Sequence, residues 1–289
     1  MSGEFQIVDA HQHFWEPKVN YHPWLRDQPP IAFRYGDYAA LRRRYLPADY
    51  FADACRWNVV KTVYVETEWD PRDPVGEMRY VERLRRETGW PSVAVAQAWL
   101  EREDCAQLLE CQAQFDFVRG IRHKPCAGQM NDARWRAGYA HLGRFGLRFE
   151  LQAPWAQLDE AVRLACDFPD TLIILNHTGL AADRSRAGID GWRRALAGVA
   201  ACPNAVVKVS GLGCPGRPWT VDANRAIVLT AIDLFGIERT MFASNFPVDG
   251  LCASFNDIVL GCREIVRGLA PHEQRQFFHD NAIRLYAME

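Results

Sequence analysis

Short apolar segments alternate with longer amphipathic segments along almost the whole chain. The apolar segments are rich in β-branched residues, which is typical of buried strands. The segments between them have the spacing and the charged faces of helices. The pattern predicts eight strands, at residues 7–13, 59–68, 92–99, 117–122, 147–152, 171–177, 205–210 and 240–245.

Helical segments are expected between and after these strands, at residues 48–57, 76–86, 101–114, 133–144, 155–167, 189–201, 221–235, 254–269 and 271–286. Apolar strands that alternate with helices form parallel sheets covered by helices. Eight such units fit a closed (β/α)8 TIM barrel better than an open sheet, which usually has a glycine-rich phosphate-binding turn after its first strand. The sequence has no such turn and no linker, so we expect one α/β barrel domain over residues 1–289.

The first predicted strand ends in two histidines, His11 and His13, one residue apart. Because strand side chains alternate between faces, both imidazoles are expected to point the same way. Active sites of TIM barrels lie at the carboxyl ends of the strands, and polar residues end the other predicted strands too. They include Glu66, Glu68, Gln97, Arg122, His123, Glu150, Gln152, Asn176, His177, Lys208, Ser210, Ser244 and Asn245.

Some of these charged residues have an alternative role. Glu66 and Glu68 share a predicted strand face with Tyr64, and Lys208 shares one with Val206. If those faces point into the barrel, the charges are buried, and an unpaired buried charge is costly. Buried ion pairs, for instance between Glu66 and Lys208, are therefore as good an interpretation as substrate binding.

Composition limits the possible partners. The chain is 48% hydrophobic with a formal net charge of −2, which is typical of a globular protein and gives no sign of a nucleic-acid or anionic-membrane partner. No apolar run approaches the roughly 20 residues that span a bilayer, and no export signal is recognisable. We expect a cytoplasmic protein with a small-molecule substrate and reduced cysteines, and the sequence leaves its oligomeric state open.

Residues 14–46 contain many prolines and aromatic side chains but no strand or helix pattern. Connections of this length are usually functional or disordered, and the aromatic content argues against disorder. We therefore expect an ordered loop over a site, with Trp24 among the residues that contact substrate.

Seven motifs occur in order along the chain: Val8-Asp9-Ala10-His11-Gln12-His13-Phe14-Trp15, Tyr21-His22-Pro23-Trp24-Leu25, Val118-Arg119-Gly120-Ile121-Arg122-His123, Leu175-Asn176-His177-Thr178-Gly179, Val207-Lys208-Val209-Ser210-Gly211-Leu212, Ser244-Asn245-Phe246-Pro247-Val248 and Asn281-Ala282-Ile283-Arg284-Leu285-Tyr286. As an ordered set they resemble the amidohydrolase superfamily. Within it, the chain is similar to the predicted metal-dependent hydrolases of the 2-pyrone dicarboxylate lactonase and L-fuconolactonase type.

The resemblance implies a barrel that hydrolyses a lactone or a similar ester, with a role in carbohydrate metabolism. His11 and His13 match the family's pair after the first strand, and His177 matches the histidine after the sixth. Arg122 resembles the residue after the fourth strand that binds a carboxylate or carbonyl oxygen, which suits its planar, permanently charged fork. Substrate contacts are expected from Trp24, Glu66, Glu68, His123, Gln152 and Lys208.

Two positions depart from the family pattern. Metal-dependent members carry a histidine after the fifth strand, where this chain has Gln152, and an aspartate after the eighth, where it has Asn245. An asparagine amide can orient water but is a poor base and a weak ligand. Asp249, four residues later, is the leading substitute for the base, with His177 and Glu68 as alternatives. Alternatively, Asp249 is an ordinary loop aspartate before the next helix.

Because of these departures, the sequence does not decide whether the protein binds a metal. His11, His13 and His177 could hold one divalent metal such as zinc, with an open position for water. In the metal-free route, which the sequence slightly favours, the histidines and Arg122 polarise the carbonyl and stabilise the oxyanion. A decarboxylase or other lyase, with Arg122 and Lys208 holding a carboxylate, and a non-catalytic sugar-acid binding protein are the alternative functions.

Overall fold

A computed structural model describes residues 5–214 and 216–289. Eight parallel strands form one sheet in the order β1 to β8, so each strand pairs with its neighbours in sequence. This is the (β/α)8 arrangement that the alternating pattern predicts. The strands are β1 (Gln6–Gln12), β2 (Asn58–Val65), β3 (Val93–Gln97), β4 (Val118–His123), β5 (Arg148–Leu151), β6 (Ile173–Leu175), β7 (Ala205–Val209) and β8 (Thr240–Phe242).

The barrel is nearly closed. The end of β1 meets the segment after β8 at the carboxyl end of the barrel, and we call this junction the seam. Beyond the end of β8, the Asn245 amide donates to the His11 carbonyl over 2.7 Å, and the His13 amide donates to the Phe246 carbonyl over 2.8 Å. Asp9, buried on β1, strengthens the seam by accepting from the Ser244 hydroxyl at 2.5 Å and the Ser244 amide at 2.8 Å. The seam therefore fixes His11, His13 and Asn245 relative to one another.

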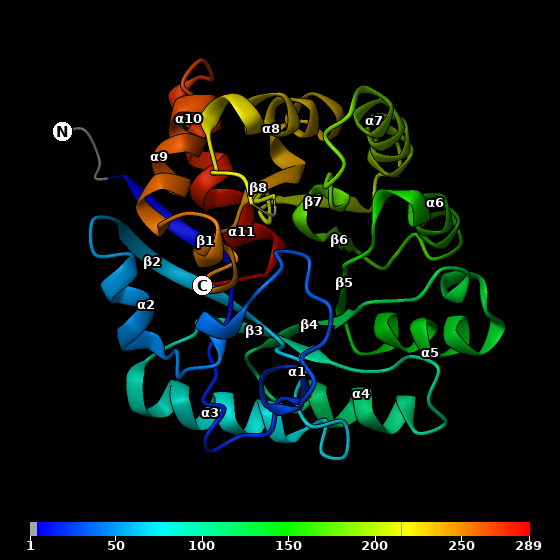
Figure 1. Cartoon of the computed structure of the whole chain (residues 1–289). Helices are drawn as coiled ribbons and strands as arrows, with labels where there is room; N and C mark the ends of the chain where they lie inside the picture. The colour runs from blue at the N-terminus through cyan, green and yellow to red at the C-terminus, as the bar shows by residue number, and fades with distance from the viewer. Residues whose placement is uncertain (1–4, 215) are drawn as a thin grey trace.

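Helices surround the strands as a ring (Figure 1). The predicted ranges 133–144 and 221–235 coincide with α5 and α8, because a side-chain cap begins each: Asp132 and Thr220 accept from backbone amides three residues on. The helices are α1 (Pro23–Arg26), α2 (Pro47–Asp53), α3 (Gly76–Thr88), α4 (Cys105–Ala113), α5 (Ala133–Arg144), α6 (Leu158–Asp167), α7 (Arg186–Ala200), α8 (Val221–Phe235), α9 (Phe255–Ile265), α10 (Pro271–Arg275) and α11 (Asn281–Leu285).

An inner apolar core fills the lower part of the barrel and is separate from the larger core between the strands and the helices. Residues of α11 and the turn after it, Leu285, Tyr286 and Met288, pack against this inner core. The strands contribute Val8, Ala10, Val63, Val65, Val93, Val95, Ile174, Val206 and Met241, and Ala243 follows directly after β8. The C-terminal segment therefore plugs the barrel at the end opposite the polar strand ends.

Tyr64 does not share a face with Glu66, as the alternation suggested. Its ring lies in the outer core, and its hydroxyl donates to Glu77 of α3 over 2.8 Å. The alternation stops because β2 ends at Val65. Glu66 therefore follows the geometry of the loop and pairs with Arg122 instead.

The segment 14–46 is ordered around α1 and a 3-10 helix, Ala39–Leu41. We call it the strap. It is tied to the end of β2, because the Trp24 indole donates to the Thr67 carbonyl over 2.8 Å. Trp24 also stacks on Phe33, with ring centroids 5.7 Å apart.

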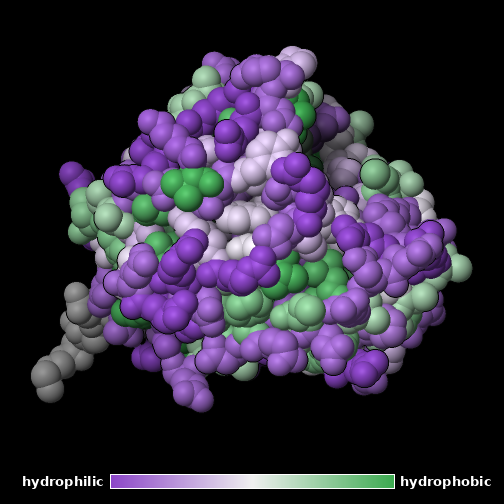
Figure 2. Space-filling view, turned by 90° about the horizontal axis from the view of Figure 1, so that it is seen from below, coloured by the Kyte–Doolittle hydropathy of each residue, from purple (hydrophilic) through white to green (hydrophobic). Residues whose placement is uncertain are grey.

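The face seen in Figure 2 is mainly hydrophilic, with hydrophobic residues in small separate groups. Within the described residues, no helix combines the length and the apolar character needed to cross a membrane.

Candidate active site

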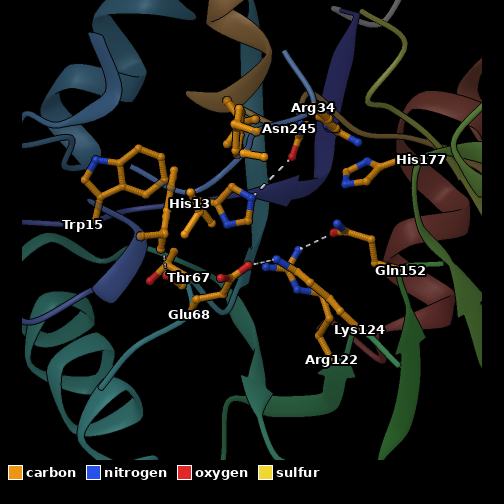
Figure 3. Close-up of a pocket in the computed structure, with 15 residues that line it drawn as sticks. His13, Trp15, Arg34, Thr67, Glu68, Arg122, Lys124, Gln152, His177 and Asn245 are labelled. Atoms are coloured by element: carbon orange, nitrogen blue, oxygen red, sulfur yellow. Dashed lines mark hydrogen bonds and ion pairs between the residues drawn. The ribbon is translucent and has the colours of Figure 1, made fainter. Parts of the chain in front are cut away.

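A cavity of about 210 Å³ opens at the carboxyl ends of the strands, and the strap forms one of its walls (Figure 3). Residues 14–46, expected to form an ordered loop over a site, thus line a cavity at this end of the barrel. The size suits a small molecule. The lining residues are His13, Trp15, Trp24, Ile31, Ala32, Phe33, Arg34, Thr67, Glu68, Arg122, Lys124, Gln152, His177, Asn245 and Val248.

The three candidate histidines meet at this point. The His11 ring centroid lies 4.9 Å from that of His13 and 4.7 Å from that of His177. Burial lowers the pKa of all three well below the ordinary histidine value. The charges that lower the pKa further are chiefly Lys208 for His11, Arg122 for His13 and Arg34 for His177. The imidazoles are therefore neutral at pH 7.

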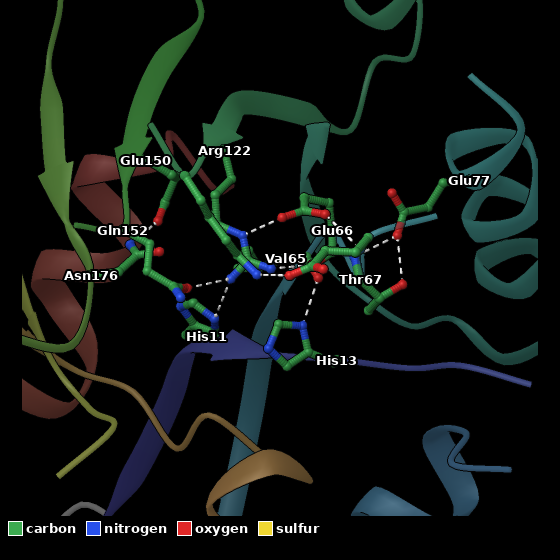
Figure 4. A network of polar contacts seen from close by, with 12 residues as sticks. His11, His13, Val65, Glu66, Thr67, Glu77, Arg122, Glu150, Gln152 and Asn176 are labelled. Carbon is green, nitrogen blue, oxygen red and sulfur yellow. Dashed lines mark hydrogen bonds and ion pairs between the residues drawn. The ribbon is translucent and has the colours of Figure 1, made fainter. Parts of the chain in front are cut away.

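Arg122 projects from β4 into the cavity lining and is held by Glu66 and Gln152 (Figure 4). Its Nε donates to Glu66 Oε1 and its Nη2 donates to the Glu66 carbonyl, each over 2.5 Å. Its Nη1 donates to Gln152 Oε1 over 3.2 Å and lies 3.4 Å from His11 Nε2. Glu66 therefore positions the guanidinium, and Nη1 is the part nearest the histidines.

A buried carboxyl group supports the end of β2. Glu77 Oε1 accepts from the Thr67 amide and from the Thr67 hydroxyl, each over 2.7 Å. Burial, followed by the nearby negative charge of Glu66, raises the pKa of Glu77 to about 7. Glu77 thus fixes the loop that carries Glu68 without contacting the cavity itself.

Asn245 in the cavity wall and Asp249 behind it form a linked pair. Asn245 Nδ2 donates to Asp249 Oδ1 over 2.6 Å, and Asn245 Oδ1 lies 3.4 Å from His13 Nε2. Asp249 also accepts from the Tyr35 hydroxyl at 2.9 Å and the Gly211 amide at 3.0 Å. Burial raises the pKa of Asp249, which these donors oppose. Because the carboxylate is enclosed by donors, it positions Asn245 and cannot reach a substrate as the expected base.

Backbone strain collects where strands end at the site. Glu68, His177 and Asn245 have φ values of 53°, 54° and 56°, a region that costs energy for residues other than glycine. β6 ends at Leu175 and β8 at Phe242, earlier than the predicted 177 and 245, and His177 and Asn245 follow in this left-handed conformation. Gly211 packs so closely on His177 that a Cβ there would lie 2.7 Å from the imidazole Cγ.

Not all predicted site residues reach the cavity. His13, Trp24, Glu68, Arg122, Gln152, His177 and Asn245 line it, whereas His11, Glu66 and Asp249 lie directly behind it. His123 turns toward α5 instead, where its Nδ1 accepts from the Trp135 indole over 3.1 Å. Its expected substrate contact has no support in this geometry.

Lys208 is also outside the lining. Its Nζ donates to Glu150 Oε2 over 2.7 Å, and both side chains are fully buried. Glu150 accepts from the Tyr286 hydroxyl and the Asn176 amide as well. The expected pairing of Glu66 with Lys208 is replaced by two pairs, Glu66–Arg122 and Glu150–Lys208. Lys208 therefore has a structural role in the barrel interior rather than a place against substrate.

Two cationic lining residues were not predicted, Arg34 of the strap and Lys124 after β4. Lys124 forms an ion pair with Glu68. Its place two residues after Arg122 was an available signal. Arg34 had none beyond its position in a loop expected to cover the site.

The histidines do not fit a divalent metal. His11 Nε2 lies 3.4 Å from Arg122 Nη1, and the fixed charge of this guanidinium opposes a cation. No carboxylate joins the three imidazoles in the place that Asn245 occupies. Within residues 5–214 and 216–289, no three His, Cys, Asp or Glu side chains are arranged to hold a metal ion.

Fold and site together define a TIM-barrel enzyme with its polar groups at the carboxyl ends of the strands. The chain belongs to the amidohydrolase family, whose model matches residues 8–288. This confirms the superfamily inferred from the motifs.

Among similar proteins, the uncharacterized protein y4mH of Sinorhizobium fredii is 38% identical, over 98% of this chain and 99% of that one. The L-fucono-1,5-lactonase of Burkholderia ambifaria is 27% identical, over 98% of this chain and 96% of that one. The crystal structure of an amidohydrolase from Burkholderia multivorans with bound zinc superposes with a TM-score of 0.82 at 23% identity, over 99% of this chain and 100% of that one. The family and its lactonase-named members identify the chain as a hydrolase.

Proposed function

We propose that the protein hydrolyses a small polar lactone of the sugar-acid type. The observation that carries the proposal is the arrangement of the cavity. Two hydrogen-bond acceptors, on His13 and Asn245, face each other on one side, and the donors of Arg122 and His177 lie close by. Ester hydrolysis needs both features, one for the attacking water and one for the developing oxyanion.

The acceptor pair follows from the proton positions. The Val65 carbonyl can only accept, so His13 Nδ1 carries the hydrogen and the neutral ring presents a lone pair at Nε2. Asn245 Nδ2 donates to Asp249, so Asn245 Oδ1 is also an acceptor. Two acceptors 3.4 Å apart have no hydrogen between them. We assign the water to this place, with one hydrogen toward each acceptor and its lone pair toward the substrate.

The donors complete the chemistry. Arg122 Nη1 binds the lactone carbonyl oxygen. The Ser210 hydroxyl, 2.8 Å from His177 Nδ1, donates to that nitrogen, so the hydrogen of the neutral ring is on Nε2. His177 Nε2 then donates to the same carbonyl oxygen. Water attacks the carbonyl carbon while His13 Nε2 takes its proton. The bond from that carbon to the ring oxygen then breaks, and the proton passes from His13 to the ring oxygen. The product is the open-chain hydroxy acid.

A panel of aldono-1,4- and aldono-1,5-lactones, aldaro-lactones and 2-pyrone-4,6-dicarboxylate tests the proposal. Acid release is followed in a pH-stat, and carbon dioxide release is measured in parallel. We expect acid release from at least one lactone, and loss of this rate in His13→Gln. Carbon dioxide release, or inertness toward every lactone, would overturn the proposal in favour of a lyase or of a binding protein.

A further inference from the structure

Arg34 is the cation of the cavity whose hydrogen-bonding capacity is unused. Its guanidinium lies over the Tyr35 ring, 4.6 Å from the centroid, and its side chain is 25% exposed. The nearest carboxylate oxygen, Asp249 Oδ1, is 3.6 Å from Nη2, which is beyond hydrogen-bond distance. Among the residues that the structure describes, the buried Nη1 has no acceptor.

The other two cations of the lining differ from Arg34 in this respect. Arg122 donates to Glu66 and Gln152, and Lys124 is paired with Glu68. Asp249 attracts Arg34 by charge without a hydrogen bond, and its Oδ1 already accepts from Tyr35 and Asn245. In Figure 3, Arg34 lies beside Asn245 and His177, and Arg122 lies across the cavity from it. Both guanidinium groups line the same cavity, so a ligand whose carbonyl is held by Arg122 can present a second group to Arg34.

A charged donor without an acceptor is costly, and a ligand that supplies the acceptor recovers part of this cost. A guanidinium offers a planar fork of donors, which matches the two oxygens of a carboxylate. A hydroxyl group satisfies only one donor and brings no charge.

We propose that Arg34 selects substrates that carry a carboxylate in addition to the lactone, so that the preferred substrate is an acid lactone rather than a neutral one. This inference rests on the proposed lactone hydrolysis. It assigns to the strap the recognition of the acidic group, while the strand ends perform the reaction.

Matched lactones test it. D-glucaro-1,4-lactone and D-glucono-1,4-lactone differ only in whether C6 is a carboxylate or a hydroxymethyl group, and the corresponding galactaro- and galactono-lactones provide a second pair. The variants are Arg34→Met, Arg34→Lys and the control Arg42→Met. Arg42 also belongs to the strap and lies over a tyrosine ring, 5.3 Å from the Tyr38 centroid, but it is outside the cavity lining.

We expect the wild type to prefer the acid lactone of each pair. Arg34→Met should lower kcat/KM for the acid lactones by about 10- to 100-fold, mainly through KM, and leave the neutral lactones within about twofold. Arg34→Lys should retain part of the preference, and Arg42→Met all of it. A wild type that prefers neutral lactones, or an Arg34→Met that slows both kinds equally, would overturn the inference; the latter would make Arg34 an oxyanion stabiliser.

Failure of the proposed function gives a different pattern. If none of the four lactones is hydrolysed, calorimetric titration with D-glucarate decides the role of Arg34. Binding that Arg34→Met weakens by about tenfold or more, and that Arg42→Met leaves unchanged, supports the carboxylate site. Absence of binding, or equal binding by the wild type and Arg34→Met, refutes it.

Discussion

Asn245 donates its amide to Asp249 over 2.6 Å, and this bond turns its carbonyl oxygen toward His13. The aspartate that relatives of this family place after the eighth strand is thus replaced by an amide that a second, deeper aspartate orients. Asp249, four residues later, is buried behind the cavity wall.

Replacing Asn245 by the aspartate of the family pattern should therefore lower the activity of this enzyme. In Asn245→Asp two carboxylates would lie within hydrogen-bond distance, so they would repel each other or share a proton. We expect kcat/KM at pH 7 to fall by roughly 10- to 100-fold, the range assigned to loss of a positioned acid–base partner. A steady-state pH profile with the best lactone measures this. A gain of activity would mean that the asparagine is a handicap and not a working part of the site.

Arg122→Lys should remove the fork that Glu66 and Gln152 hold, although the charge remains. Since Nη1 is the group assigned to the carbonyl oxygen, we expect kcat to fall on the order of 100-fold with little change in stability. Arg163→Lys, in an exposed pair with Asp159, is the control. Equal kcat values in wild type and Arg122→Lys would show that the guanidinium has no role in the reaction.

Chelation should have little effect. Arg122 stands beside His11, and an amide replaces the expected carboxylate ligand, so we expect activity after dialysis against EDTA to stay within about twofold of the untreated enzyme. Metal analysis of the same samples provides the stoichiometry. Loss of activity that one equivalent of zinc or manganese restores would contradict this expectation.

Lys208→Met should destabilise the protein strongly, because it leaves Glu150 charged and unpaired inside the barrel. Breaking a buried pair from one side costs about 3–5 kcal/mol. Urea denaturation of the variant, beside the exposed-site control Lys18→Met, measures the loss. Lys208→Met/Glu150→Gln should recover part of it, since the unpaired charge is gone. If Lys208→Met lowered only activity, the ammonium would belong to the substrate site after all.

Glu77 should make stability depend on pH. Its pKa in the folded protein is raised to about 7, against 4.5 ordinarily, so the folded state binds the proton more tightly between these values. Its contribution is therefore favourable below pH 4.5 and is lost as the pH rises toward 7, by at most about 1.4 kcal/mol per pH unit. Glu77→Gln should flatten this part of the stability curve. Glu82→Gln, on the exposed side of α3, should not change it.

The alternating pattern was sufficient to predict the barrel, because strand apolarity and helix periodicity are local properties of the sequence. The pairing of buried charges was not predictable in the same way. Lys208 on β7 meets Glu150 on β5 across the barrel interior, so the choice of partner depends on the stagger of strands that are not adjacent. The expected Glu66–Lys208 pair had equally suitable chemistry but the wrong geometry.

The candidate site was predictable where a residue ends a strand and less so elsewhere. His13, Arg122, His177 and Asn245 lie where the barrel requires. His123 follows Arg122 directly and so points to the opposite side, toward Trp135. Whether Asp249 can act as the base depends on the donors that surround it, and the sequence does not show them. Arg34 lies in a segment without periodicity, where the sequence gives no direction for a side chain.

The plug formed by Leu285, Tyr286 and Met288 has a consequence for the order of events during synthesis. Strands β1 to β8 are complete by Phe242, yet their inner apolar faces have no cover until α11 and the turn after it have been made. A nascent chain that ends before these residues would present an open, apolar barrel interior. We therefore expect the innermost core to form only after α11 and the turn that follows it have emerged from the ribosome.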